Sequence, residues 1–357
     1  MTTETMDLAK AEAFAGGVMG AMNSGFSTLM ISVGQRTGLF DKMATLPPST
    51  SEEIANAAGL NERYVREWLG NMTVTRYVDH DPVKGTYFFP PEHAASLTRA
   101  AGPGNLAVLS EYLAQMGKVE DDVVEAFRNG GGVPYAKFDR FQELMRQESG
   151  AIFDAALVDV TLPLVDGLIA KLESGIDVAD IACGAGHAIN VMARAFPKSR
   201  FTGYDFSQEG IGFGRAEAKE WGLSNAVFEM KDAATLDVHA KYDLITVFDA
   251  IHDQAQPRTV LKKIAAALKP DGTFLCADIA ADSTHAGNMD HPMAPAMYAM
   301  STFHCMTVSL ALGGEGLGAM WGKQKAHELF REAGFTSVEE RAVPGDFMNV
   351  YYLCRKA

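Results

Sequence analysis

The sequence predicts an α/β protein with a helical amino-terminal part and a doubly wound sheet in its carboxyl-terminal half. From residue 176 onward, seven short apolar runs follow one another, and helical segments separate the early ones. A glycine-rich turn directly follows the first run. Alternation of this kind is typical of a mostly parallel sheet that helices cover on both faces.

The apolar runs predict the strands of this sheet, at residues 176–182, 199–204, 226–229, 242–248, 273–278, 337–342 and 350–355. The connection before the last run contains Pro344, Gly345 and Asp346 and is too short for a crossover helix. We therefore expect the last strand to run antiparallel to its neighbour.

The first hundred residues predict a winged helix. Apolar spacing predicts a helix at 26–43, and capping residues predict two more that begin near Ser51 and after Asn61. Two short strands, at 77–80 and 85–89, flank a turn. The predicted domains are a winged-helix and dimerisation domain at 1–100, a helical connector and lid at 101–175, and a cofactor-binding domain at 176–357.

Composition limits the possible partners. The chain has 357 residues and a net charge of −14, and residues 21–100 carry seven Lys and Arg against eight Asp and Glu. Phosphate contacts need an excess of positive charge, so DNA binding is disfavoured. The four cysteines lack metal-type spacing, the amino-terminal segment is acidic, and no apolar stretch spans a bilayer. We expect a cytoplasmic protein with no metal and no membrane contact.

The glycine-rich turn predicts a cofactor site. Asp180, Cys183, Gly184 and Gly186 end the first strand and lead into a helix, whose free N–H groups favour an anionic ligand group. Asp205 ends the next strand, where a carboxylate can accept hydrogen bonds from both ribose hydroxyls. A dinucleotide needs a third glycine, and Ile189 stands there instead. S-adenosylmethionine has no pyrophosphate and fits the shorter turn better.

The run of an acid, three residues, glycine, any residue and glycine from Asp180 to Gly186 resembles the first motif of class I S-adenosylmethionine-dependent methyltransferases. With the winged helix, the chain is similar to small-molecule O-methyltransferases and to two-domain mycobacterial methyltransferases. The resemblance implies a Rossmann-like, seven-stranded sheet with an antiparallel last strand. It also implies a homodimer in which the winged helix covers the partner's active site.

Further residues at the strand ends complete the predicted cofactor site. Asp180 can lie near the ammonium group of the cofactor, and Asp232 can accept a hydrogen bond from the adenine amino group. Phe206 can lie against the purine. Asp232 as a helix cap and Phe206 as a core residue are the alternatives. Three other residues belong to the predicted site, namely Cys183, Ala233 and Phe248.

His252 follows the fourth strand and matches the histidine of a His-Asp pair in the family that the chain resembles. The resemblance implies that it takes the proton from a substrate hydroxyl and that Asp278 flanks it. The family's second acid is replaced by Gln324, an amide that can still orient an imidazole. The alternative is that His252 caps the next helix or only lines the pocket.

The segment 282–319 predicts a substrate pocket. Its helical spacing of flexible apolar and aromatic side chains suits a small, partly apolar metabolite, although the same pattern is typical of ordinary core. The predicted pocket residues are Met293, Met297, Met300, Phe303 and His304. Two rival functions stay open: a winged-helix regulator that binds S-adenosylmethionine as a ligand, and an NAD-dependent oxidoreductase.

Overall fold

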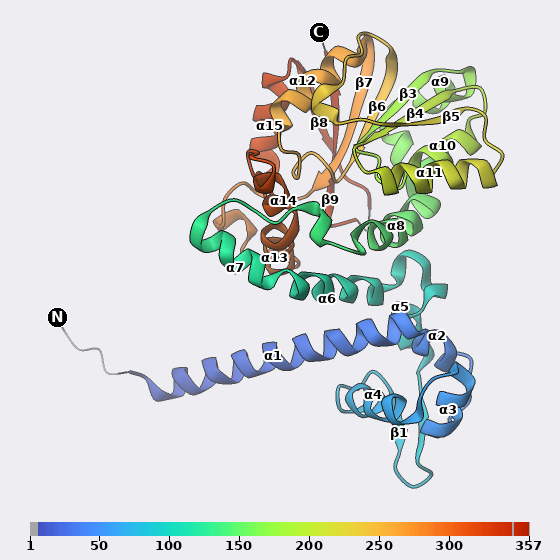
Figure 1. Cartoon of the computed structure of the whole chain (residues 1–357), viewed down its shortest axis with the longest axis vertical. Coiled ribbons are helices and arrows are strands. Elements are labelled where there is room, and N and C mark those ends of the chain that lie inside the picture. Colours follow the sequence, from blue (N-terminus) through green and yellow to red (C-terminus); the bar gives the residue numbers. More distant parts are fainter. Residues whose placement is uncertain (1–5, 345, 357) are drawn as a thin grey trace. The chain divides into compact units, whose positions relative to one another are not determined.

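The computed structural model describes residues 6–344 and 346–356. The chain divides into two compact units, residues 1–115 and 116–357 (Figure 1). No helix within the described ranges is long and apolar enough to cross a membrane. Gly345, in the predicted connection before the last strand, lies outside the described residues.

The first unit is a winged helix preceded by a long helix. Its elements are α1 (Leu8–Thr37), α2 (Leu39–Met43), α3 (Ser51–Ala58), α4 (Glu62–Val74), β1 (Asp79–Asp81), β2 (Thr86–Phe88), α5 (Pro91–Leu97), the 3₁₀ turns η1 (Arg99–Gly104) and η2 (Leu106–Leu109), and the start of α6 (Ser110–Lys118). The predicted helix at 26–43 is in fact two helices, because Gly38 has a φ of 74° and ends α1. The hairpin of β1 and β2 is the predicted wing.

Side-chain caps and one buried indole fix this unit. Thr50 and Glu53 form a capping box at the start of α3, and the side chain of Asn61 caps α4, as predicted. In the core, Trp68 donates its indole N–H to the carbonyl of Met30 at 2.8 Å. The α4 helix is therefore tied to α1 by a hydrogen bond that only tryptophan supplies.

The second unit contains a seven-stranded sheet in the order β5-β4-β3-β6-β7-β9-β8. The strands are β3 (Asp177–Ile181), β4 (Arg200–Asp205), β5 (Ala226–Met230), β6 (Tyr242–Phe248), β7 (Leu268–Ile279), β8 (Ser337–Arg341) and β9 (Asn349–Arg355). Only β9 runs against its neighbours. The predicted doubly wound sheet with an antiparallel last strand is therefore confirmed.

Helices cover both faces of the sheet (Figure 1). Buried side chains of α9 (Leu168–Ser174), α10 (His187–Ala195) and α11 (Gln208–Glu220) share one core cluster with β3 and β4. On the other face, α12 (Pro257–Ala267) and α15 (Gly322–Glu332) pack against β6 and β7. This arrangement leaves the carboxyl ends of the central strands to form the site.

Two further segments of this unit are helical. The first comprises α7 (Glu120–Asn129), η3 (Tyr135–Lys137), α8 (Phe141–Ile152), the π-helix η4 (Phe153–Thr161) and η5 (Leu162–Leu164); the second comprises η7 (Ala286–Asn288), α13 (Ala294–Met300), the π-helix η8 (Ser301–Cys305) and α14 (Met306–Ala311). They meet where Val133 donates its N–H to the hydroxyl of Thr307 at 2.8 Å. A Cβ on Gly132 would lie 2.0 Å from the Thr307 carbonyl oxygen, so glycine is required for this approach.

His187, the first residue of α10, joins three helices. Its Nδ1 lies 2.9 Å from both carboxylate oxygens of Glu217 on α11, and its Nε2 lies 3.2 Å from Asp154 on η4. Burial acts to lower the pKa of His187, but the two carboxylates outweigh it and raise that pKa above its ordinary value. The protonated imidazole thus holds η4 against α10 and α11.

We expect Glu217→Gln to lower the free energy of unfolding by about 1 kcal/mol at pH 6 and by much less at pH 9. The pKa of His187 is raised on folding, so the stability it contributes is fully present below its unfolded pKa and is lost as pH rises through its folded pKa. Urea unfolding at the two pH values measures this difference. Asp154→Asn is the control and should cost less, because Asp154 is mostly exposed. An equal loss at both pH values would contradict the ion-pair account.

Candidate active site

The cofactor turn lies between β3 and α10. Gly184 and Gly186 have φ angles of 53° and 70°, in the left-handed region that favours glycine. A Cβ on Gly186 would lie 2.2 Å from the Phe228 ring, so a larger residue there would displace that side chain. A Cβ on Gly184 would meet only the Gln142 side-chain oxygen, at 3.8 Å. The two glycines therefore serve different needs, close packing at one and an open approach at the other.

Asp205 is fixed across this turn. One of its carboxylate oxygens accepts the N–H of Gly184 at 2.8 Å, and the other accepts the N–H of Ser207 at 2.7 Å. Burial raises the pKa of Asp205, although these backbone donors oppose the shift. Each oxygen keeps a lone pair for a second donor, which suits the two hydroxyls of a ribose.

Asp180 is the second buried acid of the turn and is 2% exposed. It accepts a hydrogen bond from the Thr246 hydroxyl at 2.8 Å. Burial and the charge of Asp205 raise its pKa to about 7. Within the described ranges, no basic side chain forms an ion pair with Asp180 or Asp205. A ligand that brings an ammonium group and vicinal hydroxyls would satisfy both acids, and S-adenosylmethionine carries these groups.

The residues predicted around the adenine lie at the ends of the next strands. Asp232 accepts the N–H of Ala234 at 2.8 Å, so it caps the turn η6 (Ala233–Thr235) and keeps one oxygen for a ligand. Phe206 is 51% exposed, and the alternative that it belongs to the core is wrong. Ala233 is buried, and Phe248 packs against Phe153 of η4 with ring centroids 5.0 Å apart.

Cys183 lies inside the turn and is partly buried. Burial and the neighbouring acids Asp180 and Asp205 raise its pKa well above the ordinary value for a thiol. The other three cysteines are buried, and all four are free thiols. A neutral thiol in this position is a packing residue of the turn rather than a nucleophile.

His252 and Asp278 meet at the carboxyl ends of β6 and β7. The Nδ1 of His252 lies 2.7 Å from one oxygen of Asp278, and both side chains are buried. The same oxygen accepts the N–H of Ile279 at 2.8 Å and the indole N–H of Trp321 at 3.0 Å. Burial acts to lower the pKa of His252, but the Asp278 charge prevails and raises it well above the ordinary value. The carboxylate thus fixes the ring, and Cys305 is a second hydrogen-bonding neighbour of the imidazole.

Two expectations about this histidine need correction. Gln324 does not orient the imidazole, because it accepts the N–H of Ser283 and donates to Asp282 instead. Trp321, three residues earlier, supports Asp278 in that region. His252 does not cap the following helix either, because Gln256 is the cap residue of α12.

Two more acids lie beside His252. Burial and the Asp278 charge raise the pKa of Asp249 to about 8. Burial raises the pKa of Asp253 to about 6, and the nearby His252 opposes this shift. At neutral pH, Asp249 is therefore mostly protonated and Asp253 is mostly ionised. Among the described residues, no group of three or more acidic, histidine or cysteine side chains is arranged to hold a metal ion.

The predicted substrate residues lie on α13 and η8. Met293, Met300 and Phe303 are partly buried, and His304 is buried. Met297 packs on a small cluster formed by Ala281, Ala294 and Met320, which is the core alternative. The π-helical turn of η8 shifts the helical spacing on which the prediction relied.

Sequence reasoning missed the residues that the segment 135–142 supplies. Tyr135 packs edge-on against Phe206 at 5.6 Å, and its hydroxyl accepts a hydrogen bond from Gln142 at 3.1 Å. Gln142 in turn reaches the glycine turn, as described above. The available signal was the run of aromatic residues at three-residue spacing, Tyr135, Phe138 and Phe141.

Comparison with known proteins identifies both parts of the chain. Residues 25–99 match the family described as the Rv2258c-like winged HTH domain, and residues 172–334 match a methyltransferase domain family. The demethylmenaquinone methyltransferase of Lactococcus lactis is 25% identical over 181 residues, which cover 46% of this chain and 68% of that protein. The chain spans about half the length of the other curated relatives it matches.

Solved structures share the fold over nearly the whole chain. The structure of PigF with SAH has a TM-score of 0.72 and 19% identity and covers 95% of this chain and 98% of its own. The mitomycin 7-O-methyltransferase MmcR has a TM-score of 0.72 and 17% identity, with 98% and 100% covered. The chain thus consists of a winged helix-turn-helix domain followed by a methyltransferase domain with the fold of S-adenosylmethionine-dependent enzymes.

Proposed function

We propose that this protein transfers the methyl group of S-adenosylmethionine to an oxygen of a small, partly apolar metabolite, with His252 as the general base. The observation that carries the proposal is the buried His252–Asp278 pair, 2.7 Å apart, at the same sheet edge as the glycine turn. The names of similar proteins, which include O-methyltransferases, support oxygen as the acceptor.

The cofactor supplies an activated methyl group on a sulfonium, and this chain supplies its binding site. Asp180 holds the ammonium group, and Asp205 accepts the ribose hydroxyls. Asp232 and Phe206 hold the adenine, one by a hydrogen bond and the other by ring contact. These assignments rest on two buried acids, Asp180 and Asp205, that have no ion-pair partner among the described residues, and on the exposure of Phe206.

The acceptor hydroxyl becomes a competent nucleophile as it loses its proton. The Nε2 of His252 accepts this proton, while Asp278 holds Nδ1 and stabilises the resulting imidazolium. Trp321 and the N–H of Ile279 fix the carboxylate, so the ring keeps one orientation. The Asp278 charge outweighs burial and raises the pKa of His252, which makes the imidazole a stronger base.

A regulator that binds S-adenosylmethionine is the alternative function, and the charges of α4 disfavour it. Arg63 pairs with Glu67, and Arg66 pairs with Glu62, so the cations of this helix are already matched. A gel shift on promoter DNA across a salt series separates the two functions. Calorimetry with S-adenosylmethionine and with NAD separates both from an oxidoreductase. Cytoplasmic location stays a prediction from the sequence.

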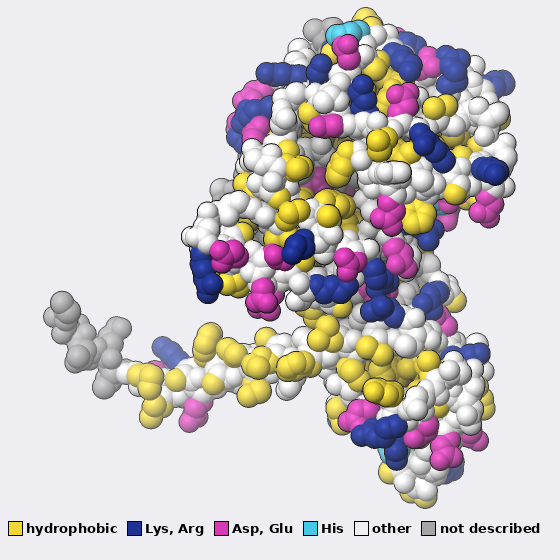
Figure 2. All heavy atoms as spheres, viewed as in Figure 1, with side chains coloured by type: hydrophobic (Ala, Val, Ile, Leu, Met, Phe, Trp, Pro, Cys, Tyr) yellow, Lys and Arg dark blue, Asp and Glu magenta, His cyan; other side chains and the backbone are white. Residues whose placement is uncertain are grey.

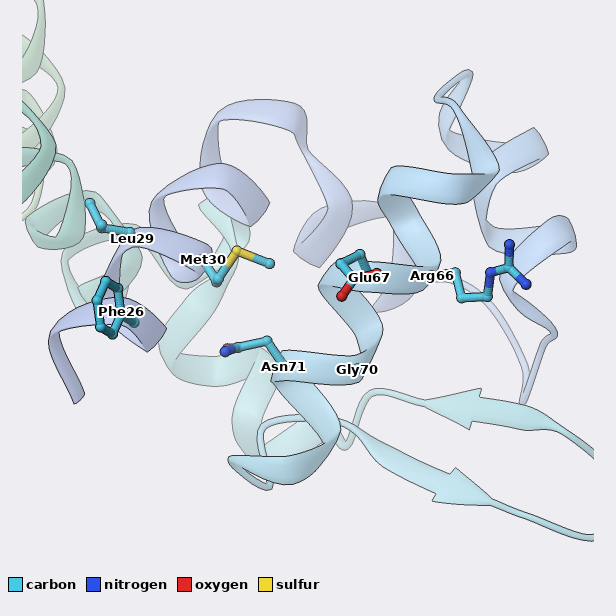
Figure 3. A pocket seen from close by; sticks show the side chains of 7 residues that line it. All are labelled: Phe26, Leu29, Met30, Arg66, Glu67, Gly70 and Asn71. Atoms are coloured by element: carbon cyan, nitrogen blue, oxygen red, sulfur yellow. The ribbon is translucent and has the colours of Figure 1, made fainter. Parts of the chain in front are cut away.

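The exposed apolar surface of α1 supports the proposal of a homodimer. Large apolar side chains are exposed along the helix, and Figure 2 shows part of this row; they are Leu8, Phe14, Val18, Met19, Met22, Phe26, Leu29 and Val33. Beside them lies a groove lined by Phe26, Leu29 and Met30 of α1 and by Arg66, Glu67, Gly70 and Asn71 of α4 (Figure 3). A helix with such a surface is typical of an interface with a second copy.

We expect the double variant Phe14→Glu, Met19→Glu to be monomeric and the wild-type chain to be dimeric, because two buried charges would oppose association. Light scattering measures the mass of each. Val83→Glu is the control, since Val83 is exposed on the wing and far along the chain from α1. A monomeric wild-type protein would remove the dimer proposal, and a dimeric double variant would remove α1 from the interface.

We expect His252→Ala to lower turnover by about 10²–10⁴, because general-base catalysis contributes at that scale. Calorimetry should show nearly unchanged S-adenosylmethionine affinity. Asp278→Asn should cost less and should move the rise of the rate to lower pH, because the carboxylate favours the protonated imidazole.

The acceptor for this experiment comes from a methylation screen of metabolite extracts. A wild-type rate in His252→Ala would contradict the proposed base. The acceptor would then reach its reactive ionisation state without help from the protein, and proximity and orientation alone would account for the rate.

A further inference from the structure

His304 sits within an aromatic cage that the segment 135–142 forms. Its ring stacks on Phe141, with centroids 3.6 Å apart and an interplanar angle of 13°. Phe138 and Tyr135 pack edge-on against it at 4.8 Å and 5.3 Å. We name these three residues, Tyr135, Phe138 and Phe141, the cage. They bring a flat, apolar surface to η8, beside the sheet edge that carries the base.

One nitrogen of the imidazole in this cage has no hydrogen-bond partner among the described residues. His304 is 2% exposed, and within residues 6–344 and 346–356 its Nε2 has no hydrogen-bond partner. Burial and the charge of His252 lower the pKa of His304 to about 3, so the ring is neutral at physiological pH. A buried polar atom without a partner destabilises a fold, and phenylalanine would stack equally well at no such cost.

The cage lies close to the reacting groups. The next residue, Cys305, contacts the side chain of His252. Burial and the nearby charges of Asp253 and Asp205 raise the pKa of Tyr135. A ring that packs against the cage can therefore present one substituent to His252 and another to His304. The two imidazoles differ, because His252 is held by Asp278 and has a raised pKa, whereas the pKa of His304 is lowered.

We propose that His304 is a specificity-determining residue that hydrogen-bonds a second oxygen of an aromatic substrate, next to the hydroxyl that is methylated. The substrate class is an aromatic ring with two neighbouring oxygen substituents. This inference rests on the proposed function, because it assumes that His252 faces the acceptor hydroxyl. A purely structural histidine would stack in the cage and would not affect the choice of ligand.

Binding in the absence of turnover tests the proposal directly. The probes are 1,2-dihydroxynaphthalene and 1-naphthol, which differ by one oxygen, and each is titrated into the full chain saturated with S-adenosylhomocysteine. Wild type should bind the two-oxygen ring about tenfold more tightly, as expected for one hydrogen bond to a buried group. His304→Phe keeps the stacked ring and should abolish this preference by weakening only the two-oxygen probe.

A second measurement guards against a misfolded variant. Ligand-free His304→Phe should unfold a few degrees above wild type, because it removes the unpaired nitrogen and keeps the stacking. His304→Gln, which retains a polar group, should recover part of the preference. A lower unfolding midpoint in His304→Phe would mean that the imidazole is structural and would overturn the proposal.

The remaining outcomes separate this inference from the proposed function. Equal affinity of wild type for the two probes, no binding of either, or a preference that survives in His304→Phe would overturn the role of His304. If the preference follows His304 while labelled S-adenosylmethionine methylates neither probe, the binding inference stands and the proposed O-methylation of such rings fails.

Discussion

The burial of carboxyl groups is the constraint on which this site depends. Five of them lie at or near the ends of four neighbouring strands. Burial raises the pKa of Asp180, Asp205, Asp249 and Asp253, and the fifth group, Asp278, is fully buried. Backbone N–H groups, a threonine hydroxyl and an indole compensate part of the desolvation cost. The remaining desolvation cost favours the binding of a cationic ligand, because an opposite charge stabilises the ionised form of a buried acid.

The same constraint explains how cofactor and base can share one sheet edge. Asp205 faces the glycine turn and remains available to hydroxyl donors, whereas one oxygen of Asp278 is engaged with His252, Trp321 and Ile279, and its other oxygen has no hydrogen-bond partner within the described residues. The first acid can bind a ligand, and the second holds a side chain in place. Asp205 and Asp278 thus have different roles because their hydrogen-bond partners differ, although both are aspartates.

The sequence predicted the sheet and its turn because their signals are local. Buried strands are apolar runs, and the glycines of the turn have left-handed φ angles that leave few other choices. The pair of His252 and Asp278 could also be predicted, since the two residues lie at the ends of neighbouring strands. The role of Gln324 was predicted wrongly, because the sequence does not show which way the side chains of its helix point. The break at Gly38 in the predicted helix 26–43 was missed, because the apolar spacing continues on both sides of it.

The positions of the residues in the segment 135–142 could not be predicted from the sequence. Tyr135, Gln142 and Phe141 follow a glycine-rich break, and their positions depend on the contact between Gly132 and α14, which joins segments far apart in the chain. Nothing local in the sequence specifies that contact. The substrate side of the site was therefore predicted from the helical spacing of the segment 282–319, as three methionines with Phe303 and His304, while the structure adds the aromatic rings that lie beside His304.

Proton release on cofactor binding tests the central claim, that buried acids create the cofactor site, most directly. Asp180 has a pKa of about 7 without a ligand, so near pH 7 it is about half protonated. An ammonium group beside it would lower that pKa and release about half a proton per site. Calorimetric titration of S-adenosylmethionine at pH 7, in buffers with different ionisation enthalpies, measures this number. We predict net proton release that falls in Asp180→Asn; binding without release, or the same release in the variant, would contradict the account.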